Sequence, residues 1–234
     1  MINNRDFAGR IIVALDVGDK EAAFSLVREL EFAKTFKVGL KLFTAEGPSF
    51  LRALKAQGKD VFLDLKLHDI PNTVSETVKV CTRYGARLMT LHASGGREMM
   101  SRAADAARSE AENQGLPKPG LLAVTVLTSL NDRSIQEIGI STDTKEQVIK
   151  LAKLAEESGM DGVVCSPWEI EIVKKETGQD FLVVSPGIRP AWSAAHDQKR
   201  IMTPSQAIEK GADYIVIGRP IIAAPSPSEA FNKI

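Results

Sequence analysis

The segment Asp64-Leu65-Lys66-Leu67-His68-Asp69 places acidic and basic side chains at short, regular intervals. In an extended strand, residues two apart point to the same side, so we expect Asp64 and Lys66 to face the same way. Burying a charge without a partner costs several kcal/mol, and these charges must therefore be paired. Lys37, in a neighbouring apolar run, is the obvious further partner. Such an array is more typical of a site of chemistry than of a buried stabilising ion pair, which is the alternative.

Two segments near the C-terminus have the composition of a phosphate site. Pro186-Gly187-Ile188-Arg189 follows one apolar run, and Gly218-Arg219 follows the next. Backbone N–H groups at such turns and the planar guanidinium of arginine both suit phosphate oxygens. We therefore expect these two segments to bind a phosphate group. The alternative is a surface arginine after an ordinary turn.

The elements that must position these residues alternate between short apolar runs and longer helical patterns. The runs have the composition of strands buried on both faces. They are Ile11–Asp16, Phe36–Gly39, Val61–Leu65, Leu88–His92, Leu121–Val126, Gly162–Cys165, Phe181–Val184 and Tyr214–Ile217. Strands alternating with helices predict parallel pairing with right-handed crossovers. Eight units favour an α/β fold, a (β/α)8 TIM barrel forming a single domain over residues 1–234, with a doubly wound open sheet as the alternative.

In such a barrel the active site forms at the carboxyl ends of the strands, and polar residues gather at the predicted ends. Asp16 ends the first run, His92 ends the fourth, and Thr128 and Ser129 follow the fifth. We expect His68 to face the helix layer. The chain's three scattered histidines predict no metal site.

Composition limits the possible functions further. The formal net charge is zero, which argues against a general nucleic-acid binder. Residues 1–10 lack the apolar segment of a signal peptide, and no apolar run is long enough for a membrane span. Cys81 and Cys165 lie far apart without metal-ligand spacing, and we expect buried free thiols in a reducing cytoplasm.

The decapeptide Asp64-Leu65-Lys66-Leu67-His68-Asp69-Ile70-Pro71-Asn72-Thr73 resembles the signature of the orotidine 5′-phosphate decarboxylase family. A wider superfamily shares the Asp-x-Lys-x-x-Asp core, whereas the longer decapeptide is much more specific. The resemblance covers the whole chain. It includes Leu15-Asp16, Lys37-Val38-Gly39, His92-Ala93, Leu127-Thr128-Ser129, Pro186-Gly187-Ile188-Arg189, Asp197-Gln198 and Gly218-Arg219.

The resemblance implies a role for each matching position. Lys37, Asp64, Lys66 and Asp69 would form a catalytic charge array, with Lys66 as the proton donor. Asp69 would reach into the partner's site in a homodimer, and Thr73 would touch the ribose of the partner's ligand. The remaining substrate-binding positions would be Asp16 at the ribose, Thr128 and Ser129 at the pyrimidine, Pro186 in the pocket, and Arg189, Gln198, Gly218 and Arg219 at the phosphate.

The implied reaction is the conversion of orotidine 5′-phosphate to UMP and CO2, the last step of de novo pyrimidine nucleotide synthesis. It would need neither a cofactor nor a metal. The implied protein is a cytoplasmic homodimer that binds orotidine 5′-phosphate and UMP, and neither nucleic acid nor a membrane.

Two other functions remain open. Metal-dependent sugar-phosphate decarboxylases and synthases share the Asp-x-Lys-x-x-Asp core, but they generally place an acidic ligand in the region of Lys37. Lys37 and the Ile70-Pro71-Asn72-Thr73 segment favour the nucleotide enzyme instead. A barrel that senses a phosphorylated ligand without turnover is the second alternative.

Overall fold

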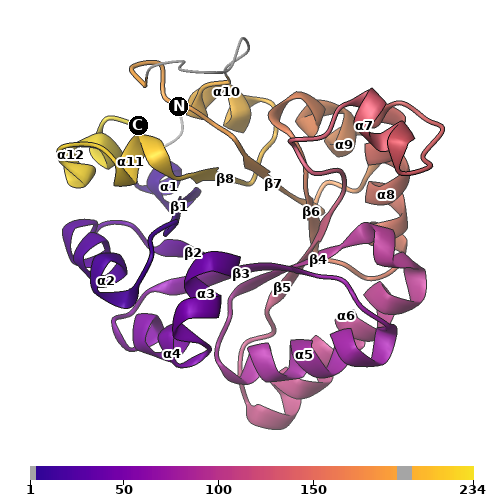
Figure 1. Ribbon diagram of the computed structural model, residues 1–234, viewed down its shortest axis with the longest axis horizontal. Coiled ribbons are helices and arrows are strands. Elements are labelled where there is room, and N and C mark those ends of the chain that lie inside the picture. The colour runs from indigo at the N-terminus through magenta and orange to yellow at the C-terminus, as the bar shows by residue number, and fades with distance from the viewer. Residues whose placement is uncertain (1–3, 194–201) are drawn as a thin grey trace.

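The computed structural model describes residues 4–193 and 202–234, with side chains from Phe7 onward. Within these residues, strands β1 to β8 pair in parallel in sequence order, and β8 pairs with β1 to close a barrel. Figure 1 shows the strands as a ring with the helices arranged around it. The predicted single-domain (β/α)8 TIM barrel is confirmed.

The strands consist largely of apolar residues, as a sheet buried on both faces requires. They are β1 (Ile11–Ala14), β2 (Thr35–Gly39), β3 (Asp60–Leu67), β4 (Leu88–His92), β5 (Gly120–Val124), β6 (Gly162–Val164), β7 (Leu182–Pro186) and β8 (Tyr214–Ile217). All eight predicted strands are present, and several of their ends differ slightly from the predicted ones.

Side chains that accept hydrogen bonds from backbone N–H groups begin several helices, as Asp19 and Asp143 do. The α-helices are α1 (Asn4–Gly9), α2 (Lys20–Glu29), α3 (Leu40–Glu46), α4 (Ser49–Ala56), α5 (Pro71–Arg83), α6 (Gly96–Gln114), α7 (Asp132–Glu137), α8 (Thr144–Glu157), α9 (Ile170–Glu176), α10 (Pro204–Glu209), α11 (Arg219–Ile222) and α12 (Pro227–Asn232). Two short 3-10 turns are η1 (Ala93–Gly95) and η2 (Pro167–Glu169). None of these described helices is both long and apolar enough to cross a membrane.

Apolar side chains form one large cluster and a second, smaller one. The smaller cluster includes Phe62 of β3 and Leu88 of β4. Asp64 and Thr90 each follow one of these residues by two positions, so they project to the same side, nearer the carboxyl ends of the strands. A polar layer therefore lies directly beyond an apolar floor.

Strand β3 departs from regular pairing in its second half. Leu63 lies opposite Met89 of β4, but the next paired residues are Leu67 and Leu91. Four residue steps of β3 thus match two of β4, so β3 bulges between the two pairs. Lys66 lies in this bulge with φ of 53°, and it is the one non-glycine residue in the described chain with a positive φ. Its side chain is therefore aimed by the bulge and not by the regular alternation of a strand.

Candidate active site

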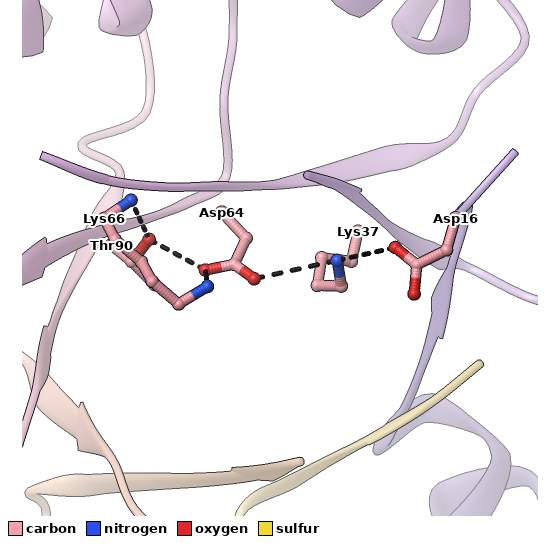
Figure 2. A network of polar contacts seen from close by, with 5 residues as sticks. All are labelled: Asp16, Lys37, Asp64, Lys66 and Thr90. Carbon is pink, nitrogen blue, oxygen red and sulfur yellow. Dashed lines mark hydrogen bonds and ion pairs between the residues drawn. The ribbon is translucent and has the colours of Figure 1, made fainter. Parts of the chain in front are cut away.

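Three of the four predicted array residues, Lys37, Asp64 and Lys66, meet in one continuous network at the carboxyl ends of the strands (Figure 2). The Lys66 ammonium lies 2.8 Å from Asp64 Oδ1, and the Lys37 ammonium lies 3.6 Å from Asp64 Oδ2. Asp64 and Lys37 are each 13% exposed, whereas Lys66 is 30% exposed. The carboxylate of Asp64 therefore holds two lysines, and the side chain of Lys66 is the more accessible of the two.

Asp16 extends this network at the end of β1. Its Oδ1 lies 3.1 Å from the Lys37 ammonium, so the charges alternate in the order Asp16, Lys37, Asp64 and Lys66. The contact between Asp16 and Lys37 was not predicted from the sequence. The pairing of β1 with β2 explains it, because Ala14 lies opposite Lys37 and the chain continues past Ala14 to Asp16.

Thr90 of β4 is a further member of the network that the sequence analysis missed. Its hydroxyl donates a hydrogen bond to Asp64 Oδ1 over 3.0 Å and accepts one from the Lys66 backbone N–H over 2.9 Å (Figure 2). The signal in the sequence was a single threonine in the inward phase of an apolar strand. That signal is weak, because threonine is common in strands.

Glycines give the network room on two sides. A Cβ atom at Gly39 would lie 2.9 Å from the Lys37 ammonium nitrogen. A Cβ atom at Gly218, just before α11, would lie 3.4 Å from Asp16 Oδ2. The predicted phosphate segment Gly218-Arg219 therefore lies directly beside the charge network. Arg219 is exposed as the first residue of α11.

The other predicted substrate-binding residues lie in loops at strand ends. Thr128 and Ser129 are exposed in the loop after β5, and Pro186 ends β7. Arg189 is half-buried, and its backbone N–H donates to the carbonyl oxygen of Met202, 3.1 Å away. Gln198 lies outside the described residues.

Asp69 and Thr73 stand apart from the network within the chain. Both side chains are exposed, and Asp69 Oδ1 accepts a hydrogen bond from the backbone N–H of Ile70 over 2.7 Å. Ile70 between them is 67% exposed, and Ile138 elsewhere in the described chain is 68% exposed. The junction of β3 and α5 therefore presents two polar side chains and an isoleucine to the solvent.

The expectation that His68 faces the helix layer was wrong. His68 is exposed, and the centroid of its ring lies 5.3 Å from that of His92. His68 lies two residues beyond Lys66 and four beyond Asp64, so it belongs to the same phase of the strand as they do, and the expectation assigned it to the wrong phase. Burial, with His68 and Lys66 adding like charge, lowers the pKa of His92, while Asp64 acts in the opposite direction. His92 is therefore held toward its neutral form beside the network.

The two cysteines take no part in the network. Both are free and buried, as predicted, and burial raises the pKa of the Cys81 thiol to about 11. In the described part of the chain, no three His, Cys, Asp or Glu side chains gather closely enough to hold a metal ion.

Taken together, the closed barrel and its lysine–aspartate network define a TIM-barrel protein with its polar site at the carboxyl ends of the strands, where enzymes of this fold carry out their chemistry. A model of the orotidine 5′-phosphate decarboxylase / HUMPS family matches residues 9–234. The chain belongs to this family.

Individual relatives agree with this assignment. The chain is 48% identical over 226 residues to the orotidine 5′-phosphate decarboxylase of Nostoc sp., covering 96% of this chain and 95% of that protein. It is 49% identical over 227 residues to the enzyme of that name from Moorella thermoacetica, covering 96% and 90%. The crystal structure of orotidine 5′-phosphate decarboxylase from Lactobacillus acidophilus matches with a TM-score of 0.83 at 40% identity, covering 95% of each chain.

Proposed function

We propose that this protein decarboxylates orotidine 5′-phosphate to UMP and CO2 without a cofactor, as the last step of de novo pyrimidine nucleotide synthesis. The observation that carries the proposal is the paired network of Lys37, Asp64 and Lys66 above an apolar floor. The names of the relatives support the same reaction.

The difficult feature of this reaction is the carbanion that forms at C6. The bond between C6 and the carboxylate breaks, its electron pair stays on C6, and CO2 leaves. An ammonium held next to C6 stabilises the developing negative charge and then donates its proton to that carbon. Lys66 is the residue for this role, because its side chain is the more exposed of the two lysines held by Asp64. The product is UMP, and the lysine regains its proton from water.

The carboxylates fix the lysines before the substrate arrives. Asp64 accepts from Lys66 and Thr90 and lies beside Lys37, so its orientation is determined from three sides. Preorganised charges of this kind need little rearrangement during the reaction, which is where most electrostatic catalysis originates. Asp16 is half-exposed beside Lys37, and in this proposal it also accepts a hydrogen bond from a ribose hydroxyl.

The rest of the substrate lies along the loops at the same end of the barrel. Thr128 and Ser129 contact the pyrimidine edge, and Pro186 lines the pocket. Arg189, Gly218 and Arg219 hold the phosphate, together with Gln198. This placement is supported by the short distance between Gly218 and Asp16, which puts the phosphate segment next to the ribose position.

A homodimer completes the site in this proposal. Asp69 and Thr73 reach from one subunit into the partner's site, where Asp69 becomes the last member of the charge array. Both side chains are exposed, which leaves them accessible to a partner subunit. Two buried free thiols are in keeping with the reducing cytoplasm as the place of action.

The test uses purified protein and orotidine 5′-phosphate in excess EDTA, with the absorbance change followed as UMP forms. The proposal expects turnover under these conditions. The alternative from the sequence analysis, a metal-dependent sugar-phosphate decarboxylase or synthase, expects none. Activity that appears only with magnesium and a sugar phosphate would contradict the proposal.

A further inference from the structure

The hydroxyl of Thr90 joins two parts of the site that no other described side chain connects. It donates to Asp64 Oδ1 and accepts from the backbone N–H of Lys66. The ammonium of Lys66 binds the same oxygen, Asp64 Oδ1. One hydroxyl therefore fixes both the main chain that carries the lysine and the carboxylate that its ammonium contacts.

The backbone at Lys66 needs such a partner. In the bulge of β3, regular pairing with β4 is lost between Leu63 and Leu67. The left-handed φ of 53° at Lys66 is unfavourable for a residue with a Cβ atom, and it persists only where its surroundings hold it. The hydroxyl of Thr90 receives the N–H of Lys66 in place of a backbone carbonyl oxygen of β4.

The side chain of Thr90 is shielded from solvent, so its hydroxyl bonds to protein groups and not to water. Thr90 is 1% exposed and lies on β4 two residues beyond Leu88 of the apolar floor. Solvent does not compete for hydrogen bonds at such a position, so they are stronger and more directional than at the surface. A valine of the same shape would fill the space and make neither bond.

We propose that Thr90 is a positioning residue: its hydroxyl holds Lys66 in the left-handed bulge conformation and thereby places the ammonium for proton transfer to C6. This inference rests on the proposed function. Thr90 acts through Lys66 and Asp64 and touches no reacting atom. Its loss should therefore lower kcat and leave nucleotide affinity nearly unchanged.

The test compares Thr90→Val with Thr90→Ser in decarboxylation of orotidine 5′-phosphate and in UMP binding. Thr90→Val is expected to lower kcat on the order of 10- to 100-fold, because small misplacements of a reacting group have effects of this size. The Kd for UMP should stay within about threefold, and Thr90→Ser should retain most of the activity. The matched control is Thr82→Val. Thr82 lies in α5 and is 1% exposed, and its hydroxyl donates to the carbonyl oxygen of Val78 in the same helix. Its replacement should leave kcat unchanged.

A second readout follows the proton itself. By microscopic reversibility, the lysine that protonates C6 also catalyses exchange of the C6 hydrogen of UMP with solvent deuterium. Its neutral amine removes the C6 proton, and the resulting ammonium exchanges with the solvent and returns a deuteron to C6. This exchange, followed by NMR, should slow in Thr90→Val in parallel with kcat, which a role in stability alone would not produce. Should Thr90→Val fail to fold, Thr90→Ala and Thr90→Ser provide the same comparison, since they differ by one hydroxyl.

The outcomes separate this inference from the proposed function. A wild-type protein that releases no CO2 from orotidine 5′-phosphate overturns the proposed function. If wild type is active and Lys66→Ala is not, but Thr90→Val keeps kcat within about twofold, the positioning role is wrong. Equal losses in Thr90→Ser and Thr90→Val also overturn it, because the hydroxyl would then not be the group that matters.

Discussion

Lys66 combines a charged side chain with a backbone conformation that costs about 1 kcal/mol for a residue with a Cβ atom. Backbone strain of this kind is concentrated at functional sites, where the surrounding contacts hold it. Here those contacts come from Thr90 and Asp64. At the scale of single residues, the site therefore depends on how accurately two ammonium groups are placed around one carboxylate.

Gly39 tests the placement of the other ammonium. Its φ of −93° suits any residue, but an added Cβ atom would lie 2.9 Å from the Lys37 nitrogen. Gly39→Ala should therefore displace the Lys37 ammonium and lower kcat by about tenfold or more, with little change in melting temperature. Gly18→Ala is the control at the same rim, where the nearest atom to an added Cβ lies 4.0 Å away. Equal kcat values for the two variants would show that Lys37 needs no such space.

His92 should make stability depend on pH. Because burial lowers its pKa below the ordinary value of 6.5, the unfolded chain binds more protons than the folded protein in the range just below 6.5. The contribution of neutral His92 to the free energy of unfolding is thus present above pH 6.5, and it is lost as the pH falls toward the lowered pKa. Urea unfolding at pH 7.5 and pH 5 should show a larger loss for wild type than for His92→Gln. An identical loss in both proteins would refute this effect.

At the scale of elements, much of the site could be predicted from apolar runs and the residues that end them. The eight strands, the meeting of Asp64 with Lys66, and the inclusion of Lys37 are all confirmed. The bulge in β3 could not be predicted, because it depends on how β3 pairs with β4 and not on local propensity. The contacts of Thr90 with Asp64 and Lys66 were missed because a single threonine in a strand is a weak signal.

Short helices are difficult to predict from a sequence. Helices α3, α7 and α11 each span two turns or fewer. A helix of that length shows little of the 3.6-residue periodicity on which such predictions depend. The position of Gln198 relative to the site remains a prediction, since that residue lies outside the described chain.

The pairing of β6 with β7 provides a test of the barrel itself. Gly162, at the start of β6, leaves no room for a side chain: an added Cβ atom would lie 2.3 Å from the carbonyl oxygen of Leu182. Gly162→Ala should lower the free energy of unfolding by about 3 kcal/mol, since the backbone itself must shift.

Gly120→Ala is the matched control at the start of β5. There the nearest atom to an added Cβ is the end of the Leu88 side chain, at 2.8 Å, so a loss of about 1 kcal/mol is expected. Both values come from urea unfolding. Equal losses would mean that the close approach of β6 and β7 does not limit stability.

At the scale of the whole molecule, the proposed dimer predicts that sites are shared. Lys66→Ala and Asp69→Ala proteins should each be inactive alone, because each removes one member of every array. After the subunits are unfolded and refolded together, about half of the dimers are mixed, and each mixed dimer contains one intact site. Activity should return to about a quarter of that of wild type. No recovery, with mixed dimers verified by differential tagging, would show that each subunit carries its own complete site.

The central claim is that the Lys66 ammonium, held by Asp64, carries out a decarboxylation that needs no metal. The most direct measurement is the single-turnover rate of CO2 release from orotidine 5′-phosphate in excess EDTA, for wild type, Lys66→Ala and Lys41→Ala. Lys41, an exposed lysine at the same rim, is the control. We predict that Lys66→Ala lowers the rate by at least about a thousandfold while UMP still binds, and that Lys41→Ala does not. A Lys66→Ala protein that retains a rate within about tenfold of wild type would contradict the account.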